Sequence, residues 1–139
     1  MIGLDTNLLA RFYVDDPNDP EAANQRPVAR RILTESPHLF VPLTVVLELE
    51  GVLRAFYGFG AADFVRVFEQ VLGLPNVRVE NWPRVADALA WHGAGLDFAD
   101  ALHLRASAPC EGFYTFDARR FARRAQRLGL RPAATVPAG

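Results

Sequence analysis

The chain has 139 residues, of which 50% are hydrophobic and 22% are charged. This length and composition describe one folded domain over residues 1–139 with enough apolar side chains for a continuous core, and they exclude a disordered chain. All fifteen basic residues are arginine, which excludes mechanisms that need a phosphate-binding or nucleophilic lysine. A single cysteine, Cys110, excludes an internal disulfide and a zinc site built from cysteines.

Charge is distributed unevenly along the chain. Residues 119–139 contain six arginines and no acid, whereas residues 1–118 contain nine arginines and sixteen acids. An acidic body followed by a basic segment predicts an anionic partner near that segment. No apolar run approaches the ~20 residues that span a bilayer, and the first residues lack a basic and apolar leader pattern. We therefore expect a cytoplasmic protein that does not enter a membrane.

The hydrophobic pattern predicts short strands that alternate with helices. In chain order we expect a strand at 1–4, a helix around 8–12, a helix at 21–34, a strand at 39–41, a helix at 44–56, a helix at 62–72, a strand at 77–79, helices at 84–92 and 97–107, a strand at 113–116, an arginine-rich helix ending at Gly129, and a strand at 133–136. This alternation predicts an α/β fold with a short, mainly parallel central sheet flanked by helices.

Two of these helices carry more detailed predictions. Pro27 is expected to kink or split the helix at 21–34, because proline removes one backbone hydrogen bond. Thr44 is expected to cap the helix at 44–56. The predicted apolar face of that helix consists of Val45, Leu49, Val52, Leu53 and Phe56.

Two aspartates each follow a predicted strand. Asp5 comes after the first strand and Asp117 after the fourth, so both lie at the carboxyl edge of a parallel sheet, where ligands bind in such folds. They converge if the first and fourth strands are neighbours. Each also has an ordinary interpretation as the N-cap of the following helix, and the same alternative applies to Asp97.

Two further acids lie on predicted helices. Glu48 lies at the border of the apolar face, whereas Glu50 is expected on the solvent side with Arg54 at i+4. Asp100 lies one turn inside the helix that Asp97 is expected to cap. The ordinary alternatives are that Asp100 complements the helix dipole and that Glu48 extends from a core-facing helix into solvent.

As a set, these acids are more specific than any one of them, and the chain resembles the PIN-domain ribonucleases, in particular the VapC-type toxins of bacterial and archaeal toxin–antitoxin pairs. The matching segments are MIGLDTNLLARF, FVPLTVVLELEGVLRAFYGF, LDFADALHL and FYTFDARRFAR. The resemblance covers nearly the whole chain and implies a PIN-like three-layer domain. Its four acids fall on Asp5, Glu48, Asp100 and Asp117, and its Thr/Ser and Asn positions on Thr6, Asn7 and Thr115. Pro27 and the turn DDPNDP depart from the family's leaner pattern.

Four crowded carboxylates repel one another by roughly 1 to 4 kcal/mol per pair at about 4 Å, so a cation is needed to make the arrangement favourable. Oxygen ligands suit Mg²⁺ or Mn²⁺, which act on phosphodiesters. The resemblance implies an endoribonuclease that hydrolyses RNA, with the four acids as catalytic residues and metal ligands. Asp97 either contributes to the outer shell of this metal site or is only a helix cap. His103, at i+3 from Asp100, contacts substrate phosphate or is an ordinary structural histidine.

The arginine-rich helix has two predicted faces. Arg120, Arg123, Arg124 and Arg127 fall within about 100° of arc on the 3.6-residue repeat. The adjoining face, which is expected to point into the core, consists of Phe121, Ala125 and Leu128. The arginine stripe holds RNA phosphates or is only a solvated face.

The resemblance also implies a homodimer and a small antitoxin that covers the active-site groove. Trp82, Trp91, Phe64 and Phe68 are interpreted as core or dimer-interface aromatics. A different class of function is a non-catalytic adaptor that binds RNA or protein with the same fold. The complete acid set argues against it, because an adaptor does not need four mutually repelling carboxylates.

Overall fold

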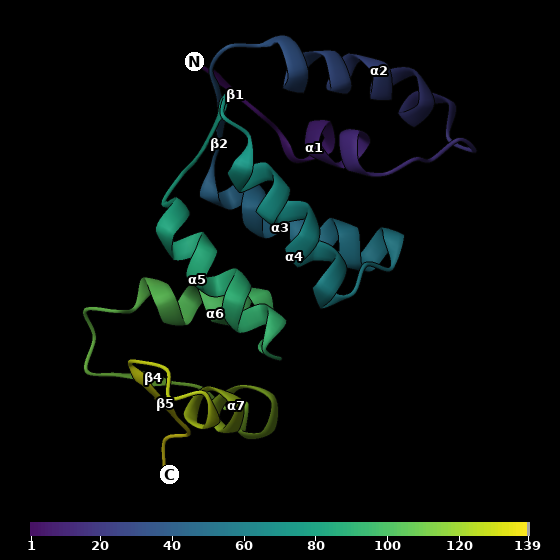
Figure 1. Cartoon of the computed structure of the whole chain (residues 1–139). Helices are drawn as coiled ribbons and strands as arrows, with labels where there is room; N and C mark the ends of the chain where they lie inside the picture. The colour runs from purple at the N-terminus through teal and green to yellow at the C-terminus, as the bar shows by residue number, and fades with distance from the viewer. Residues whose placement is uncertain (139) are drawn as a thin grey trace. The chain divides into compact units, whose positions relative to one another are not determined.

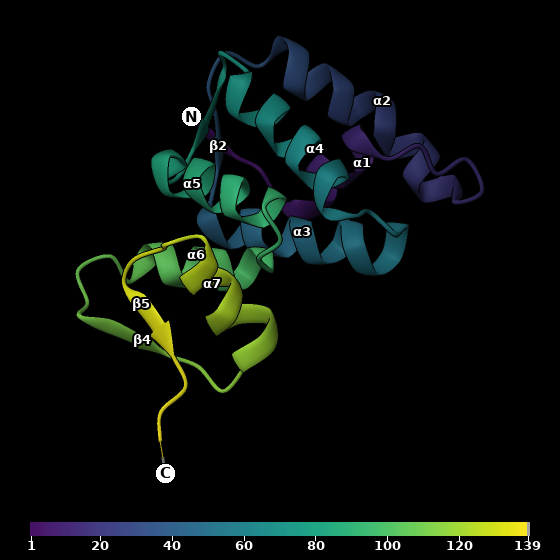
Figure 2. The same ribbon diagram turned by 60° about the horizontal axis from the view of Figure 1, so that its bottom comes forward.

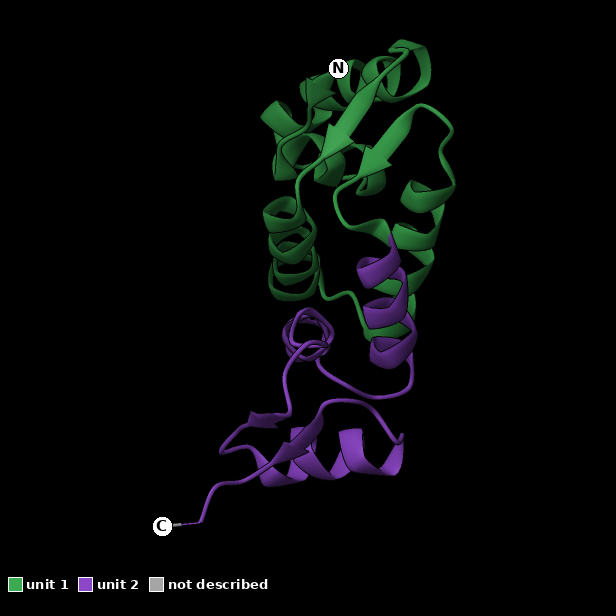
Figure 3. Ribbon diagram, turned by 90° about the vertical axis from the view of Figure 1, so that its left-hand side faces the viewer, with its two compact units in different colours: residues 1–82 green, residues 83–139 purple. Residues whose placement is uncertain are grey.

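The computed structural model describes residues 1–138 and contains two compact units, Met1–Trp82 and Pro83–Gly139 (Figure 3). The chain is mixed α/β with parallel strands flanked by helices, as predicted. Its five strands form two sheets, however, with order β1-β2-β3 in the first unit and β4-β5 in the second. The single nuclease domain over residues 1–139 stays a prediction, and residue 139 lies outside the described part.

The first unit follows the predicted order of elements (Figure 1). Its elements are β1 (Ile2–Gly3), α1 (Thr6–Tyr13), α2 (Pro20–Glu35), β2 (Leu39–Val41), α3 (Leu43–Tyr57), α4 (Ala61–Gly73) and β3 (Val77–Val79). Helix α1 packs against both α2 and α3. Within residues 1–138, no helix combines the length and the apolar composition needed to cross a membrane.

All strand pairs of the first sheet are parallel. Ile2 pairs with Leu39, and Leu39 pairs with Val77 on its other side. The three strands therefore end at the same edge of the sheet. Glu80 directly follows β3, and Asp5 lies two residues beyond β1. This edge is the place where the fold positions the first group of candidate site residues.

The core of the first unit is aliphatic and aromatic. Phe64 and Phe68 on α4 are fully buried with ring centroids 5.7 Å apart, which confirms their core role. Trp82, in contrast, is 58% exposed and is not a core residue. The other large, fully buried side chains of this unit are Leu9, Leu39, Val41, Val46, Leu49, Leu53 and Val71.

The prediction that Thr44 caps α3 is wrong. The N-cap is Pro42, whose side chain offers no hydrogen-bond acceptor, and Thr44 lies inside the first turn. Glu80, just beyond β3, instead accepts a hydrogen bond from the Leu43 backbone N–H at 2.8 Å. A carboxylate at a helix N-terminus also complements the helix dipole. The cap comes from a residue 37 positions away, so no local pattern could identify it.

The buried face of α3 is wider at one side and shorter at its end than predicted. Glu50 is 4% exposed rather than on the solvent side, because Val46 and Leu53, one turn away on either side, are both completely buried. Its predicted partner is confirmed, since Arg54 Nε donates to Glu50 Oε2 at 3.0 Å. Phe56 was expected in the core and is 79% exposed, because periodicity gives the side of a helix and not how far the core extends along it.

Helix α2 is continuous through Pro27, so the proline does not split it. Proline removes one hydrogen bond from the helix, and both Pro27 and Ala23, the residue four positions earlier, lie on the exposed side. The helix also begins with a strong local signal. Asp19 is its N-cap and accepts hydrogen bonds from the N–H groups of Glu21 and Ala22 at 3.0 and 3.3 Å.

The second unit contains the second sheet and the arginine-rich segment. Its elements are α5 (Trp82–Gly93, which begins at the last residue of the first unit), α6 (Phe98–Ala106), β4 (Gly112–Tyr114), η1 (Ala118–Ala122), α7 (Arg123–Arg127) and β5 (Ala133–Thr135). Figure 2 shows β4 beside β5, and these strands are parallel with Phe113 opposite Ala134. Helix α7 packs against β5.

The arginine-rich segment begins with a π-helical turn, η1, before the α-helical α7. Angles based on 3.6 residues per turn therefore do not apply across the whole segment. Phe121 and Ala125 are buried as predicted, but Leu128 is 40% exposed, because it is the C-cap rather than part of the packed face. Gly129 follows with φ +67°, a left-handed conformation that favours glycine and ends the helix as expected.

Candidate functional site

Asp5 lies two residues beyond β1 and is the N-cap of α1, as the sequence indicated. Its Oδ1 accepts a hydrogen bond from the backbone N–H of Thr6 at 2.8 Å. The carboxylate is exposed, so its remaining oxygen is accessible to a ligand. The capping role and a ligand role are therefore compatible in the same residue.

Thr6 connects Asp5 to a second acid. Its side chain is 3% exposed, and its hydroxyl donates a short hydrogen bond to Oε1 of Glu48 on α3. A backbone bond from Thr6 to Asp5 and a side-chain bond from Thr6 to Glu48 place both carboxylates around one buried residue. The structure thus brings together three of the predicted site residues, although they come from two helices.

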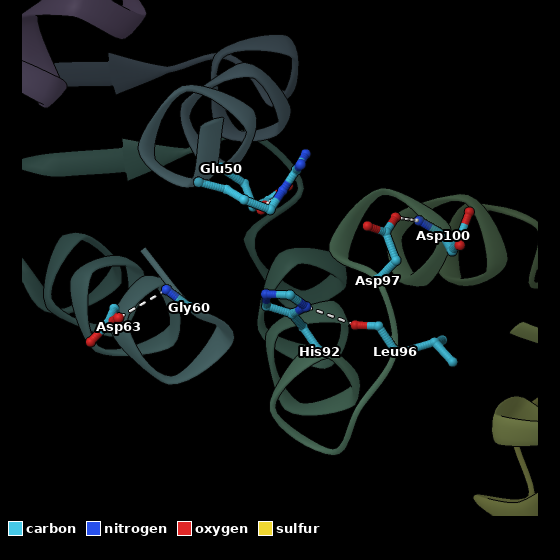
Figure 4. Close-up of polar contacts among 8 residues, drawn as sticks. Glu50, Gly60, Asp63, His92, Leu96, Asp97 and Asp100 are labelled. Carbon is cyan, nitrogen blue, oxygen red and sulfur yellow. Dashed lines mark hydrogen bonds and ion pairs between the residues drawn. The ribbon is translucent and has the colours of Figure 1, made fainter. Parts of the chain in front are cut away.

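In the second unit, Asp97 is the N-cap of α6, and its Oδ2 accepts a hydrogen bond from the Asp100 backbone N–H at 3.1 Å (Figure 4). This confirms its predicted role as a helix cap. Asp117 is the N-cap of η1, and its Oδ1 accepts from Arg120 N–H at 2.8 Å. The Asp117 N–H donates to Thr115 Oγ1 at 3.0 Å, which orients the residue just before the helix.

Asp100 lies in an unfavourable electrostatic environment for its ionised form. Burial raises the pKa of this carboxyl above its usual value, and the negative charges of Asp97 and Asp117 raise it further. His103 on the same helix opposes this shift. Repulsion among these three carboxylates is the condition under which a bound cation is favourable.

His103 and His92 have different environments. His103 is exposed one turn after Asp100. His92 is buried at the end of α5, where its Nδ1 lies 2.7 Å from the carbonyl oxygen of Leu96 and its ring packs edge-on against Phe98 (Figure 4). His92 is therefore structural. The sequence pattern gave no reason to single it out, because its partner is in the following loop.

The arginine stripe is exposed but not uniform. Arg124 Nη1 donates to the carbonyl oxygen of Gly95 at 2.7 Å, so this side chain fastens α7 to the loop before α6. Arg120, Arg123 and Arg127 are exposed. These three are the members of the stripe whose charge is available to an anionic partner.

A cavity of about 360 Å³ opens between α1 and α2, beside Asp5. Asn7, the predicted neighbour of the acids, lines it together with residues of α2. Sequence reasoning did not identify the α2 residues, because their significance depends on packing between two helices. The sequence signal at these positions is slight: two adjacent amides, Asn24 and Gln25, one turn before Val28 and Ala29.

The four predicted acids thus form two groups. Asp5 and Glu48 belong to the first unit, and Asp100 and Asp117 belong to the second, with Asp97 beside Asp100. Among residues 1–138, no group of three or more acidic, histidine or cysteine side chains is arranged closely enough to hold a metal ion. Comparison of the sequence with models of known protein families and with curated proteins finds no match.

Proposed function

We propose that this chain is an endoribonuclease that depends on Mg²⁺ or Mn²⁺ and hydrolyses RNA phosphodiester bonds. One observation carries the proposal. In each unit, an aspartate just beyond a parallel strand caps the next helix and has a second acid close by: Asp5 with Glu48, and Asp117 with Asp100. Ligands of α/β sheets bind at this position, beyond the carboxyl ends of the strands.

Each unit brings together one pair of these acids, Asp5 with Glu48 and Asp100 with Asp117. Carboxylate oxygens are the ligands that Mg²⁺ and Mn²⁺ prefer. The pKa of Asp100 is raised by burial and by the charges of Asp97 and Asp117, so a bound cation would favour its ionised form. The resemblance to PIN-domain ribonucleases names Asp5, Glu48, Asp100 and Asp117 as the residues that would hold the cation, which when bound would lower the pKa of a water and stabilise charge on the phosphate.

The other residues position the acids and the substrate. Thr6 is a positioning residue, because its hydroxyl fixes Oε1 of Glu48. Thr115 orients Asp117 through the backbone, and Asp97 holds the start of the helix that carries Asp100. In this proposal the exposed Arg120, Arg123 and Arg127 bind RNA phosphates, and His103 contacts the phosphate nearest Asp100.

The resemblance to VapC-type toxins supports a biological context for this activity. We propose that the protein acts as the toxin of a toxin–antitoxin pair, forms a homodimer, and is inhibited by an antitoxin that covers the acids. A basic C-terminal segment on an acidic body agrees with an RNA substrate.

The deciding experiment uses the purified chain, free of any partner, with single-stranded RNA in Mg²⁺ or Mn²⁺ and in excess chelator. We expect cleavage only with the cation, and products with 3′-hydroxyl and 5′-phosphate ends, because water attacks the phosphorus. Asp5→Asn should abolish cleavage while preserving the fold, because asparagine caps helices about as well as aspartate. Cyclic 2′,3′-phosphate ends or full activity in chelator would contradict the mechanism, and RNA binding without any cleavage would favour the adaptor.

A further inference from the structure

The cavity between α1 and α2 lies inside the first unit and has Asp5 at its edge. Helix α1 packs against α2, and Figure 1 shows the shorter α1 alongside part of α2. The cavity volume of about 360 Å³ is within the range of about 300–1,000 Å³ that is typical of small-molecule sites. The cavity is therefore large enough for a planar heterocycle.

The wall of this cavity is aliphatic. It is formed by Leu8 of α1 and by Val28 and Ala29 of α2. Ala29 is buried, whereas Val28 is 43% exposed at the opening. An apolar wall suits the face of an aromatic ring, because burying that face removes apolar area from water.

The polar lining of the cavity includes two neutral amides beside the charged Asp5 and Arg11. Asn7 of α1 and Asn24 of α2 both line it, and within residues 1–138 neither side-chain amide makes a hydrogen bond. An amide presents one donor and one acceptor group side by side, which matches the edge of a nucleobase. The apolar side chains of a peptide offer no such paired donor and acceptor, so the chemistry of the rim favours a base.

Arg11 places a fixed positive charge at the same cavity. Its Nε donates to Gln25 Oε1 at 2.9 Å, and its Nη1 donates to the hydroxyl of Tyr57 at 3.2 Å. Gln25 also donates to Glu21 at 3.2 Å, so the guanidinium is held from two sides. Its remaining N–H groups can pair with a phosphate, since arginine binds phosphate oxygens in a defined geometry.

We infer that the cavity between α1 and α2 is a nucleobase subsite, which holds the base of the nucleotide next to the bond that is cut. The inference rests on the proposed ribonuclease function, because Asp5 lines the cavity and is one of the proposed catalytic acids. Single-stranded RNA is recognised through bases that are turned out of the stack and bound on their faces and edges. The subsite would thus give the enzyme a base preference at one position beside the cut.

The first test does not require cleavage. Uncharged nucleosides are titrated into the full chain in chelator, and the side-chain amide signals of Asn7 and Asn24 are followed by NMR. We expect saturable shifts for at least one nucleoside, and Val28→Trp should abolish them by filling the opening. Val136→Trp is the matched control, because Val136 is also 43% exposed and lies outside the cavity. Equal shifts in Val28→Trp and wild type would overturn the inference.

The second test measures cleavage of an oligoribonucleotide and of its copy with an abasic site next to the cut. The wild type should cleave the abasic copy about 10-fold more slowly, since one bound base contributes on this scale. Val28→Trp should cleave the intact strand slowly and the abasic strand at the same slow rate. Asn24→Ala should reduce the difference in cleavage rate among strands with different bases at this position. Asn18→Ala, an exposed turn residue, is its control.

The outcomes separate the subsite from the proposed function. Nucleoside binding that Val28→Trp abolishes, in a protein that cleaves no RNA, supports the subsite and contradicts the ribonuclease. Metal-dependent cleavage that Val28→Trp leaves unchanged on both strands supports the ribonuclease and overturns the subsite. In that case the cavity is left for a segment of a protein partner.

Discussion

Asp5 in the first unit and Asp117 in the second occupy equivalent local positions, each just beyond a parallel strand and each at the N-cap of the helix that follows. The acids beside them differ. Glu48 accepts a hydrogen bond from the buried hydroxyl of Thr6, whereas Asp100 has a raised pKa because of burial and of neighbouring carboxylates. An aspartate between a strand and a helix is thus specified by its near neighbours in the chain, whereas packing sets the environment of the acid beside it.

Of the variants that test this comparison, Asp100→Asn should have the largest effect on RNA cleavage. The raised pKa of Asp100 means that its contribution to stability is present at low pH and is lost as pH rises through the folded pKa. At neutral pH the metal-free variant should therefore melt at or above the wild-type temperature. RNA cleavage should nevertheless fall at least about 100-fold, because a ligand loss exceeds the cost of losing an outer partner.

The same variant should lose most of its stabilisation by Mn²⁺. Wild-type protein at about 100 times its metal Kd should gain roughly 2.7 kcal/mol, measured as a shift in melting temperature. Asp63→Asn is the control, because Asp63 is also the third residue of its helix and accepts from the Gly60 N–H at 2.8 Å (Figure 4). If Asp100→Asn is destabilised, still cleaves RNA and still responds to Mn²⁺, Asp100 only complements its helix dipole.

Thr6→Val tests whether the hydrogen bond to Glu48 in the first unit matters for activity. Valine keeps the shape but removes the donor to Glu48, which should reduce cleavage about 10- to 100-fold, as expected for loss of a residue that orients a ligand. Unfolding free energy should fall by about 1–3 kcal/mol, because the bond involves a charged group. Thr6→Ser keeps the hydroxyl and should restore activity. A serine variant as inactive as valine would show that the methyl group, not the bond, matters.

Variants of the arginine stripe test whether the second unit contributes positive surface charge to substrate binding. Arg123→Gln with Arg127→Gln should weaken RNA binding and reduce the slope of log affinity against log salt by about 1.4, since each lost phosphate contact removes about 0.7. Arg30→Gln with Arg31→Gln removes the same charge from exposed positions on α2. Equal salt slopes for the two double variants would identify the stripe as an ordinary solvated face.

Tyr13 offers a smaller test within the first unit, as a contrast to Thr6. Its hydroxyl is buried and has no hydrogen-bond partner within residues 1–138, and burial raises the pKa of Tyr13 to about 12. Tyr13→Phe should therefore be neutral or increase stability by up to about 1 kcal/mol, because it removes an unpaired buried group.

The pH dependence of Tyr13→Phe has a definite sign. Because the folded pKa is raised from 10.0, the contribution of Tyr13 is present below pH 10 and is lost between pH 10 and 12. The chain has no lysine, so few other groups titrate there. The variant should show a flatter stability curve in this range, measured by denaturant unfolding. Tyr114→Phe, at a side chain that is 76% exposed, should leave the curve unchanged.

Local signals predicted most of the secondary structure and several site contacts. Asp5, Asp97 and Asp117 cap the helices that follow them, and Gly129 ends the last one, because each needs only the backbone groups of its near neighbours. The wrong cap prediction involves a partner far along the chain. The N-terminus of α3 is capped by Glu80, 37 residues from Leu43, so Thr44 looked like the better local candidate.

The amino-acid sequence by itself determined the alternation of helices and parallel strands and the uneven charge, and it predicted which acids would serve a metal. Only the tertiary structure decided which strands share a sheet, that Glu50 is buried, and that Thr6 binds Glu48. The physical reason is range. Capping and periodicity act within one or two turns, whereas burial and side-chain pairing depend on which surfaces meet after the chain has folded.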